Sequence, residues 1–128
     1  MPITSLYAGL LGFWFLVLTA RVIGGRRTGN ISLGDGGDAS LLRRIRAHGN
    51  FAEYVPLVLV MMAVLENTGF NGWLLHIVGV PLLLGRLLHG YALSFTSEFM
   101  QGRVVGMALT LLALAISAGM CLWRGLGL

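Results

Sequence analysis

The chain has 128 residues, of which 56% are hydrophobic and only 11% are charged, and its formal net charge is +4. This length allows one domain, and so low a charge content excludes an ordinary soluble domain, in which about a quarter of the residues are charged. The basic residues are spread along apolar segments and do not form one basic face. Nucleic-acid binding is therefore not expected.

Four largely apolar segments predict four transmembrane helices. Each approaches the roughly 20 residues needed to cross the hydrocarbon core of a bilayer. None shows the period-2 alternation of a barrel strand, so helix is the expected conformation. The expected helices span about residues 3–23, 41–66, 72–95 and 102–124. The sequence thus predicts an all-α integral membrane protein, a four-transmembrane-helix bundle that forms a single domain over residues 1–128.

The segment 24–40 is the expected loop between the first two helices. Gly24-Gly25 and Gly34-Asp35-Gly36-Gly37 are typical of turns. This loop and its flanks hold six of the nine arginines: Arg21, Arg26, Arg27, Arg43, Arg44 and Arg46. Because arginine-rich loops stay in the cytoplasm, we expect the loop to be cytoplasmic and both termini to lie on the other side of the membrane.

A polar stripe follows the first half of the second helix. On a helical wheel Arg46, Asn50 and Glu53 lie within about 60° of one another, and Arg43 and Tyr54 border them. Ionisable groups at membrane depth are costly, so they face protein or a wet cavity. The stripe therefore predicts a buried polar surface that begins at the cytoplasmic boundary.

The third and fourth helices add more cations at the same depth. Arg86 and His89 are three residues apart and share a helix face, and Arg103 begins the last helix. Glu53 is the only acid within this layer, and uncompensated buried cations indicate an anionic ligand. The alternative is an interhelical network in which Glu53 pairs with Arg46 or Arg86.

All nine basic residues are arginines. A composition bias explains this, and so does carboxylate binding, because guanidinium is a rigid two-pronged donor. The only cysteine, Cys121, forms neither an intrachain disulfide nor a metal cluster by itself, so no metal is expected.

Residues 46–56 (RAHGNFAEYVP) resemble the signature of the MAPEG family, the membrane-associated proteins in eicosanoid and glutathione metabolism. The R-A-x-x-N-x-x-E pattern carries most of this resemblance. Residues 85–89 (GRLLH) resemble the helix-three motif of microsomal prostaglandin E synthase and microsomal glutathione transferase. Residues 34–37 are similar to the loop of small bacterial members, and the resemblance covers nearly the whole chain.

The resemblance implies a homotrimer in a bacterial inner membrane, with glutathione as co-substrate bound between neighbouring protomers. The glutathione-binding positions that it implies are Arg46, Asn50, Glu53, Tyr54, Arg86 and His89. Arg103 corresponds to the arginine that faces the thiol, which makes it the candidate catalytic residue. The possible additional site residues are Arg21, Arg26, Arg43, His48 and Tyr91.

The activity implied is that of a glutathione transferase or peroxidase acting on lipophilic electrophiles that arrive from the membrane lipid. The chain departs from some members at Leu93, where they have a tyrosine, at Gly49, where they have an arginine, and at Val104, where they have a serine. A non-enzymatic protein that binds lipid or glutathione is therefore the alternative. A small proton-coupled transporter is disfavoured because the first helix contains no acid.

Overall fold

The computed structural model describes all residues, 1–128, and contains four α-helices and no strands. These are α1 (Pro2–Gly29), α2 (Ala39–Asn67), α3 (Gly72–Phe95) and α4 (Met100–Gly125). Each is long and apolar enough to cross a membrane. The prediction of an all-α chain with four membrane-spanning helices is confirmed.

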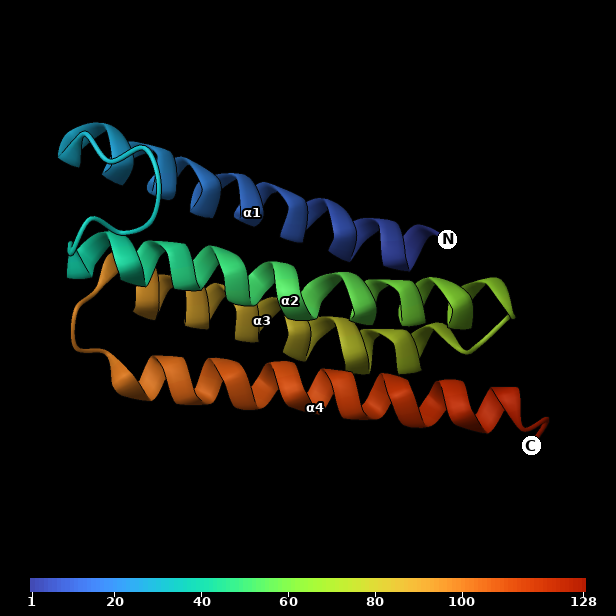
Figure 1. Cartoon of the computed structure of the whole chain (residues 1–128). Coiled ribbons are helices and arrows are strands. Elements are labelled where there is room, and N and C mark those ends of the chain that lie inside the picture. The colour runs from blue at the N-terminus through green and yellow to red at the C-terminus, as the bar shows by residue number, and fades with distance from the viewer.

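Successive helices run in opposite directions, so both termini lie at one end of the bundle with the α2–α3 turn, which we call the terminal end (Figure 1). The α1–α2 loop and the α3–α4 turn lie at the other end, which we call the loop end. Helices α2 and α3 pack against each other and separate α1 from α4, which do not touch. A single hydrophobic core joins α1, α2 and α3 and reaches α4 at Ala113.

Helix α1 extends six residues beyond its expected end at residue 23. Gly24 and Gly25 are helical, so the prediction of a turn at this pair is wrong. A Cβ on Gly25 would lie 3.0 Å from Leu41 Cδ1 and 3.3 Å from Arg44 Nη1. The absence of a side chain at Gly25 thus admits the first turn of α2, and this packing outweighs the roughly 1 kcal/mol by which glycine disfavours a helix.

Helix α2 begins after a tight loop. Gly34, Gly36 and Gly37 have positive φ angles of 68°, 59° and 78°, which glycine adopts without strain. Asp38 then caps α2, and its Oδ1 accepts hydrogen bonds from the backbone N–H groups of Ser40 at 2.9 Å and Leu41 at 3.2 Å.

At the terminal end, Glu66 of α2 caps a different helix, α1. Its two carboxylate oxygens accept hydrogen bonds from the backbone N–H groups of Ile3 at 2.9 Å and Thr4 at 2.8 Å. Met1, the residue before α1, provides no side-chain cap. A carboxylate is favoured here because it meets unsatisfied N–H groups and the positive end of the helix dipole. Glu66 therefore fixes α1 to α2 at the terminal end.

Helices α3 and α4 approach each other closely through small residues. A Cβ on Gly106 would lie 2.6 Å from the backbone nitrogen of His89 and 2.7 Å from the carbonyl oxygen of Gly85. Gly85 is correspondingly close to Gly106 and to Thr110. Small residues spaced by four let membrane helices pack backbone to backbone, and this contact places the polar groups of α3 beside α4.

We predict that Gly106→Ala destabilises the protein by about 1–3 kcal/mol, because its methyl group overpacks the α3–α4 contact. The matched control is Gly119→Ala on the same helix, where nothing lies within 4 Å of an added Cβ. That change should stabilise the protein by roughly 0.5–1 kcal/mol through helix propensity. Thermal unfolding in detergent, followed by circular dichroism, measures both. Equal shifts of the unfolding midpoint in the two variants would contradict the close α3–α4 packing at Gly106.

We predict that Glu66→Gln lowers stability by about 1 kcal/mol, because the amide loses the charge and one of the two acceptors that cap α1. Glu98→Gln makes the same chemical change at an exposed residue whose side chain forms no hydrogen bond, and should have little effect. The same unfolding measurement compares them, and an unchanged midpoint for Glu66→Gln would rule out the cap as a stabilising contact.

Candidate functional site

A polar pocket lies between α2, α3 and α4 in the loop-end half of the bundle. It has a volume of about 320 Å³, and its lining residues are Asn50, His89, Met100, Arg103, Val104 and Met107. Asn50, His89 and Arg103 come from three different helices, and all three are predicted site residues. We call this the three-helix pocket.

Asn50 and His89 both present unused hydrogen-bonding groups to this pocket. The Oδ1 atom of Asn50 is buried and has no partner. His89 Nδ1 lies 3.2 Å from Arg86 Nη2 and must accept, because a guanidinium has no acceptor. The remaining proton of a neutral His89 is then on Nε2, which has no partner in the protein. The pocket therefore contains both donors and acceptors without internal partners.

Arg86 lies directly behind His89 and is completely buried, with 0% of its surface exposed. Its Nη1 donates to Thr110 Oγ1 at 3.3 Å, and its guanidinium lies 5.9 Å from the centre of the Phe51 ring. The Nε atom has no partner, and no acid lies within ion-pair distance. Arg86 is thus a buried cation without a counter-ion.

Arg46 and Glu53 form an ion pair with 3.4 Å between Nη2 and Oε1. Of the two partners that the sequence left open for Glu53, the structure has Arg46. The Arg46 side chain passes Gly49, where an added Cβ would lie 3.2 Å from Nη1, so the glycine leaves room for the pair. About half of each side chain is exposed, 51% and 55%. Because Glu53 lies near the middle of α2, this exposure is at membrane depth.

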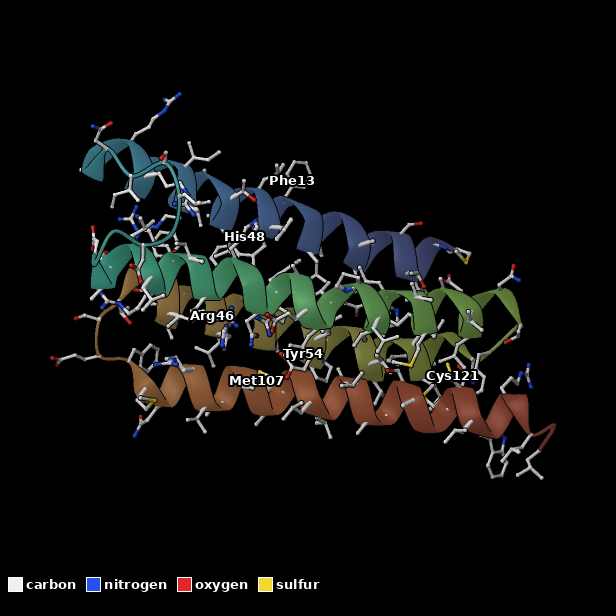
Figure 2. All side chains as sticks on the ribbon, in the orientation of Figure 1. Phe13, Arg46, His48, Tyr54, Met107 and Cys121 are labelled. Atoms are coloured by element: carbon white, nitrogen blue, oxygen red, sulfur yellow. The ribbon has the colours of Figure 1, made fainter.

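Tyr54 and Arg43 lie near the same region. In Figure 2 the labelled side chains of Arg46 and Tyr54 are on the side of α2 that faces α4. Arg43 lines a second pocket of about 240 Å³, which shares Met100 and Arg103 with the three-helix pocket. Arg43 therefore lines a pocket next to the three-helix pocket, and Arg103 lines both.

Two of the possible additional arginines do not reach the three-helix pocket of their own protomer. Arg21 Nη2 donates to the carbonyl oxygen of Ser94 at 2.7 Å, and its guanidinium lies 4.1 Å from the centre of the Phe95 ring. It thus satisfies the C-terminal end of α3, where carbonyl groups lack helical partners. Arg26 donates to the carbonyl oxygen of Gly34 at 2.6 Å and holds the loop.

His48 and Tyr91 also point away from this pocket. The His48 ring stacks on Phe15 of α1 with 4.5 Å between ring centres, on the opposite side of α2 from Arg46 (Figure 2). Tyr91 is half exposed and stacks on Phe95 at 5.8 Å. The side-chain direction on each helix places both residues outside the pocket.

Sequence reasoning missed Thr110 and Trp14. Thr110 donates to the carbonyl oxygen of Gly106 at 2.9 Å and accepts from Arg86. Trp14 Nε1 donates to the carbonyl oxygen of Arg86 at 3.0 Å, and its indole packs on Gly90. The spacing of four from Gly102 through Gly106 to Thr110 was a signal for the first. The position of Trp14 near the middle of the first apolar segment, away from the membrane interfaces, was a signal for the second.

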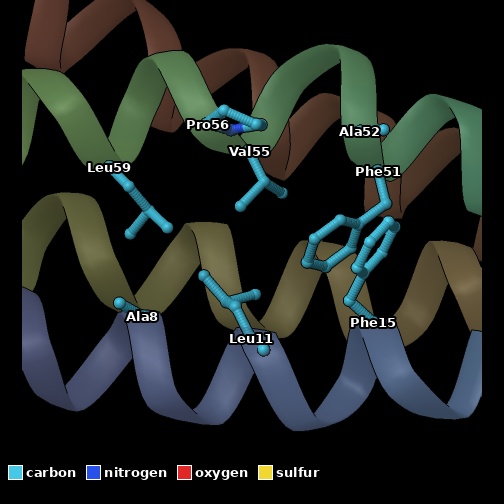
Figure 3. Close-up of a pocket in the computed structure, with 9 residues that line it drawn as sticks. Ala8, Leu11, Phe15, Phe51, Ala52, Val55, Pro56 and Leu59 are labelled. Atoms are coloured by element: carbon cyan, nitrogen blue, oxygen red, sulfur yellow. The ribbon is translucent and has the colours of Figure 1, made fainter.

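An apolar pocket of about 280 Å³ lies between α1 and α2 (Figure 3). Phe15 and Phe51 stack at one end of it with 4.8 Å between ring centres, and Leu11 and Leu59 contribute to its walls. Phe51 also approaches Arg86, so its ring separates this apolar pocket from the buried cation.

Four membrane-spanning helices, with a polar pocket between three of them, define a small multi-pass membrane protein with a candidate site between its helices. The sequence model of the MAPEG family matches residues 4–123, and the chain belongs to this family. Inner membrane protein YecN of Escherichia coli (strain K12) is 36% identical over 121 residues, which are 94% of this chain and 91% of that protein. The protein of the same name from Escherichia coli O6:H1 (strain CFT073) gives the same values.

No solved structure matches the chain. The family, the inner membrane relative and the four apolar helices together make this chain a multi-pass integral inner membrane protein. Membership of the family also connects it with glutathione-related functions at membranes.

We predict that Arg86→Met leaves the stability of the ligand-free protein unchanged or raises it, by up to about 1–4 kcal/mol. The reason is that a well-packed apolar side chain replaces a buried charge without a counter-ion. Arg27→Met, at an exposed position, is the control and should change stability by less than about 0.5 kcal/mol. Thermal unfolding without added ligand tests this prediction. Strong destabilisation by Arg86→Met would mean that Arg86 stabilises the fold through its contacts between helices.

Proposed function

We propose that the protein binds glutathione at the three-helix pocket and uses it as a co-substrate. The observation that carries this proposal is that Asn50, His89 and Arg103 meet there from three helices, with Arg86 buried behind them and no acid to balance it. An anionic ligand supplies the missing negative charge. MAPEG membership makes glutathione the anion of choice.

Glutathione suits these side chains chemically. It has two carboxylates, which arginines bind with paired hydrogen bonds, and one ammonium group, which Glu53 suits. Arg103 is exposed and has no ion pair within the protomer, so it is free to stabilise a thiolate. A nearby cation lowers a thiol pKa from its usual value of about 8.5 and increases the fraction of the nucleophilic form.

We propose a homotrimer in which a neighbouring protomer completes the site. Arg46 and Glu53 are half exposed near the middle of a membrane-spanning helix. Charged groups at this depth face protein or water, because contact with hydrocarbon is costly. A second copy that covers this face of α2 would enclose the pair and bring glutathione between two protomers.

The proposed reaction is glutathione transfer to a lipophilic electrophile. With an aryl halide, the thiolate sulfur forms a bond to the ring carbon, the carbon–halogen bond breaks, and halide leaves. A peroxidase reaction would reduce a lipid hydroperoxide to an alcohol and water while two glutathione molecules become the disulfide. The apolar pocket between α1 and α2 is the candidate place for the lipophilic substrate (Figure 3).

The second candidate is a binding protein without turnover. Leu93, at the position where some members have a tyrosine, is buried and belongs to the hydrophobic core. Tyr91 does not substitute for it, because it stacks on Phe95 at the outer surface. No phenol is therefore available one turn beyond His89 to assist the reaction.

We predict saturable glutathione binding by calorimetry in detergent, weakened about tenfold by Arg46→Ala or Glu53→Gln through the loss of a charge-assisted contact. The control variant Arg27→Ala removes an exposed arginine from the last turn of α1 and should bind glutathione with the wild-type affinity. Unchanged affinity in both site variants would assign the Arg46–Glu53 pair a structural role only.

We predict that adding glutathione to the wild type produces the ultraviolet absorption band of a thiolate in stopped-flow measurements. Arg103→Ala should still bind glutathione but lose the band, because the cation opposite the sulfur is gone. Conjugation of a generic aryl halide is measured alongside. A band without conjugation favours the binding protein, and the absence of both band and conjugation rejects the transferase.

A further inference from the structure

A second polar pocket lies at the terminal end of the bundle, far from the three-helix pocket. It has a volume of about 550 Å³, and its lining residues are Ile3, Asn71, Gly72, Trp73, His76 and Val80. It opens outward at the start of α3. None of its residues belongs to the glutathione site proposed above.

His76 is held in this pocket by a buried phenol. Tyr7 Oη lies 2.7 Å from His76 Nδ1, and only 4% of Tyr7 is exposed. The Tyr7 ring packs directly against Gly79, where any side chain would collide with it. The absence of a Cβ at Gly79 thus fixes the ring so that its hydroxyl reaches His76.

This contact favours one arrangement of the protons on His76. The Tyr7 hydroxyl forms no other hydrogen bond, so its hydrogen is used only if it is donated to His76 Nδ1. A neutral His76 then carries its own hydrogen on Nε2, which has no partner in the protein. Nε2–H of His76 is therefore a donor in the pocket whose orientation is fixed by Tyr7, a buried residue outside the pocket lining.

The surroundings of this donor favour a neutral ligand. Ile3 and Val80 are apolar, and Trp73 contacts His76 edge to face with 6.4 Å between ring centres while 79% of it remains exposed. The Glu66 carboxylate, which accepts from the backbone of Ile3, lies 4.0 Å from the N-terminal ammonium group of Met1. This pair leaves no unbalanced charge beside the pocket to attract an ionic ligand, so the acceptor that fits is an uncharged oxygen.

We propose that this pocket, which we call the His76 pocket, binds the carbonyl oxygen of a neutral lipid head group. The carbonyl accepts from His76 Nε2–H, the ring or glycerol part lies against Trp73, and the tail leaves past Val80 into the bilayer. A quinone head and an acyl ester of a glycerolipid both have this chemistry. Binding here is independent of glutathione, since the two pockets lie in opposite halves of the bundle.

The first test uses a short-tailed quinone and the quenching of tryptophan fluorescence in purified, delipidated protein. Wild type should show saturable quenching, and Trp73→Phe should lose the saturable part. His76→Leu should bind about tenfold more weakly, because the donor proposed for the carbonyl is gone. Tyr7→Phe should weaken binding by a smaller factor, because the hydrogen of His76 is then free to occupy either nitrogen.

The matched control is His48→Leu, which removes a histidine stacked on Phe15 in the loop-end half of the bundle and should leave quenching unchanged. Glutathione calorimetry on His76→Leu serves as a check of folding and should give the wild-type affinity. Equal quinone affinity in wild type and His76→Leu would overturn the proposal.

A competition experiment identifies the source of the carbonyl. Ester-linked and ether-linked phospholipids are titrated separately against bound quinone. Displacement by the ester lipid alone assigns the pocket to a glycerolipid ester, and displacement by neither assigns it to quinones. If no quinone binds, native mass spectrometry tests whether an ester lipid remains on wild type and is lost from His76→Leu. Failure of both measurements rejects the His76 pocket as a lipid site.

Discussion

The burial of the Arg86 guanidinium is the constraint around which the loop-end half of the bundle is arranged. A cation without water or a counter-ion is costly, and the cost falls only as far as neighbouring dipoles compensate it. Thr110 and His89 each accept from it, and Phe51 lies near its face. These contacts require α3 and α4 to approach to backbone distance, which the glycines at 85 and 106 permit. The close α3–α4 contact at these glycines therefore makes the burial of Arg86 possible.

The two ends of the bundle differ in the way their helices are joined. At the loop end, arginines donate to carbonyl groups of other segments, as Arg21 does to Ser94 and Arg44 does to Arg21. At the terminal end, the carboxylate of Glu66 meets the N–H groups that begin α1. The contact of Arg21 with Ser94 and that of Glu66 with α1 each satisfy a helix end by a side chain from a neighbouring helix, with the sign of charge that the helix dipole favours. This asymmetry leaves cations for an anionic ligand at one end and a neutral donor at the other.

Sequence patterns predicted those features that depend on local composition. Charge-free runs fixed the number of helices, and the wheel placed Arg46, Asn50 and Glu53 on one side of the second helix. Features that depend on tertiary contacts were not accessible: Gly24-Gly25 reads as a turn until Leu41 is seen against Gly25. Similarly, Arg21 looks like a site residue until its bond to Ser94 is known. The R-A-x-x-N-x-x-E motif identified the polar positions of the candidate site. The direction in which each side chain points could be known only from the fold.

A buried cation that destabilises the empty protein becomes useful once an anion binds beside it. A ligand that binds only the folded state stabilises it by about 2.7 kcal/mol at a concentration of 100 times its dissociation constant. That gain is comparable to the penalty for an unpaired charge such as Arg86. Under the proposed function, glutathione offsets the electrostatic cost of its own site, and the same argument applies to Arg46 and Glu53 when a neighbouring protomer covers them. Under the same proposal, the isolated protomer retains an exposed ion pair because the surface that would cover it lies on another copy.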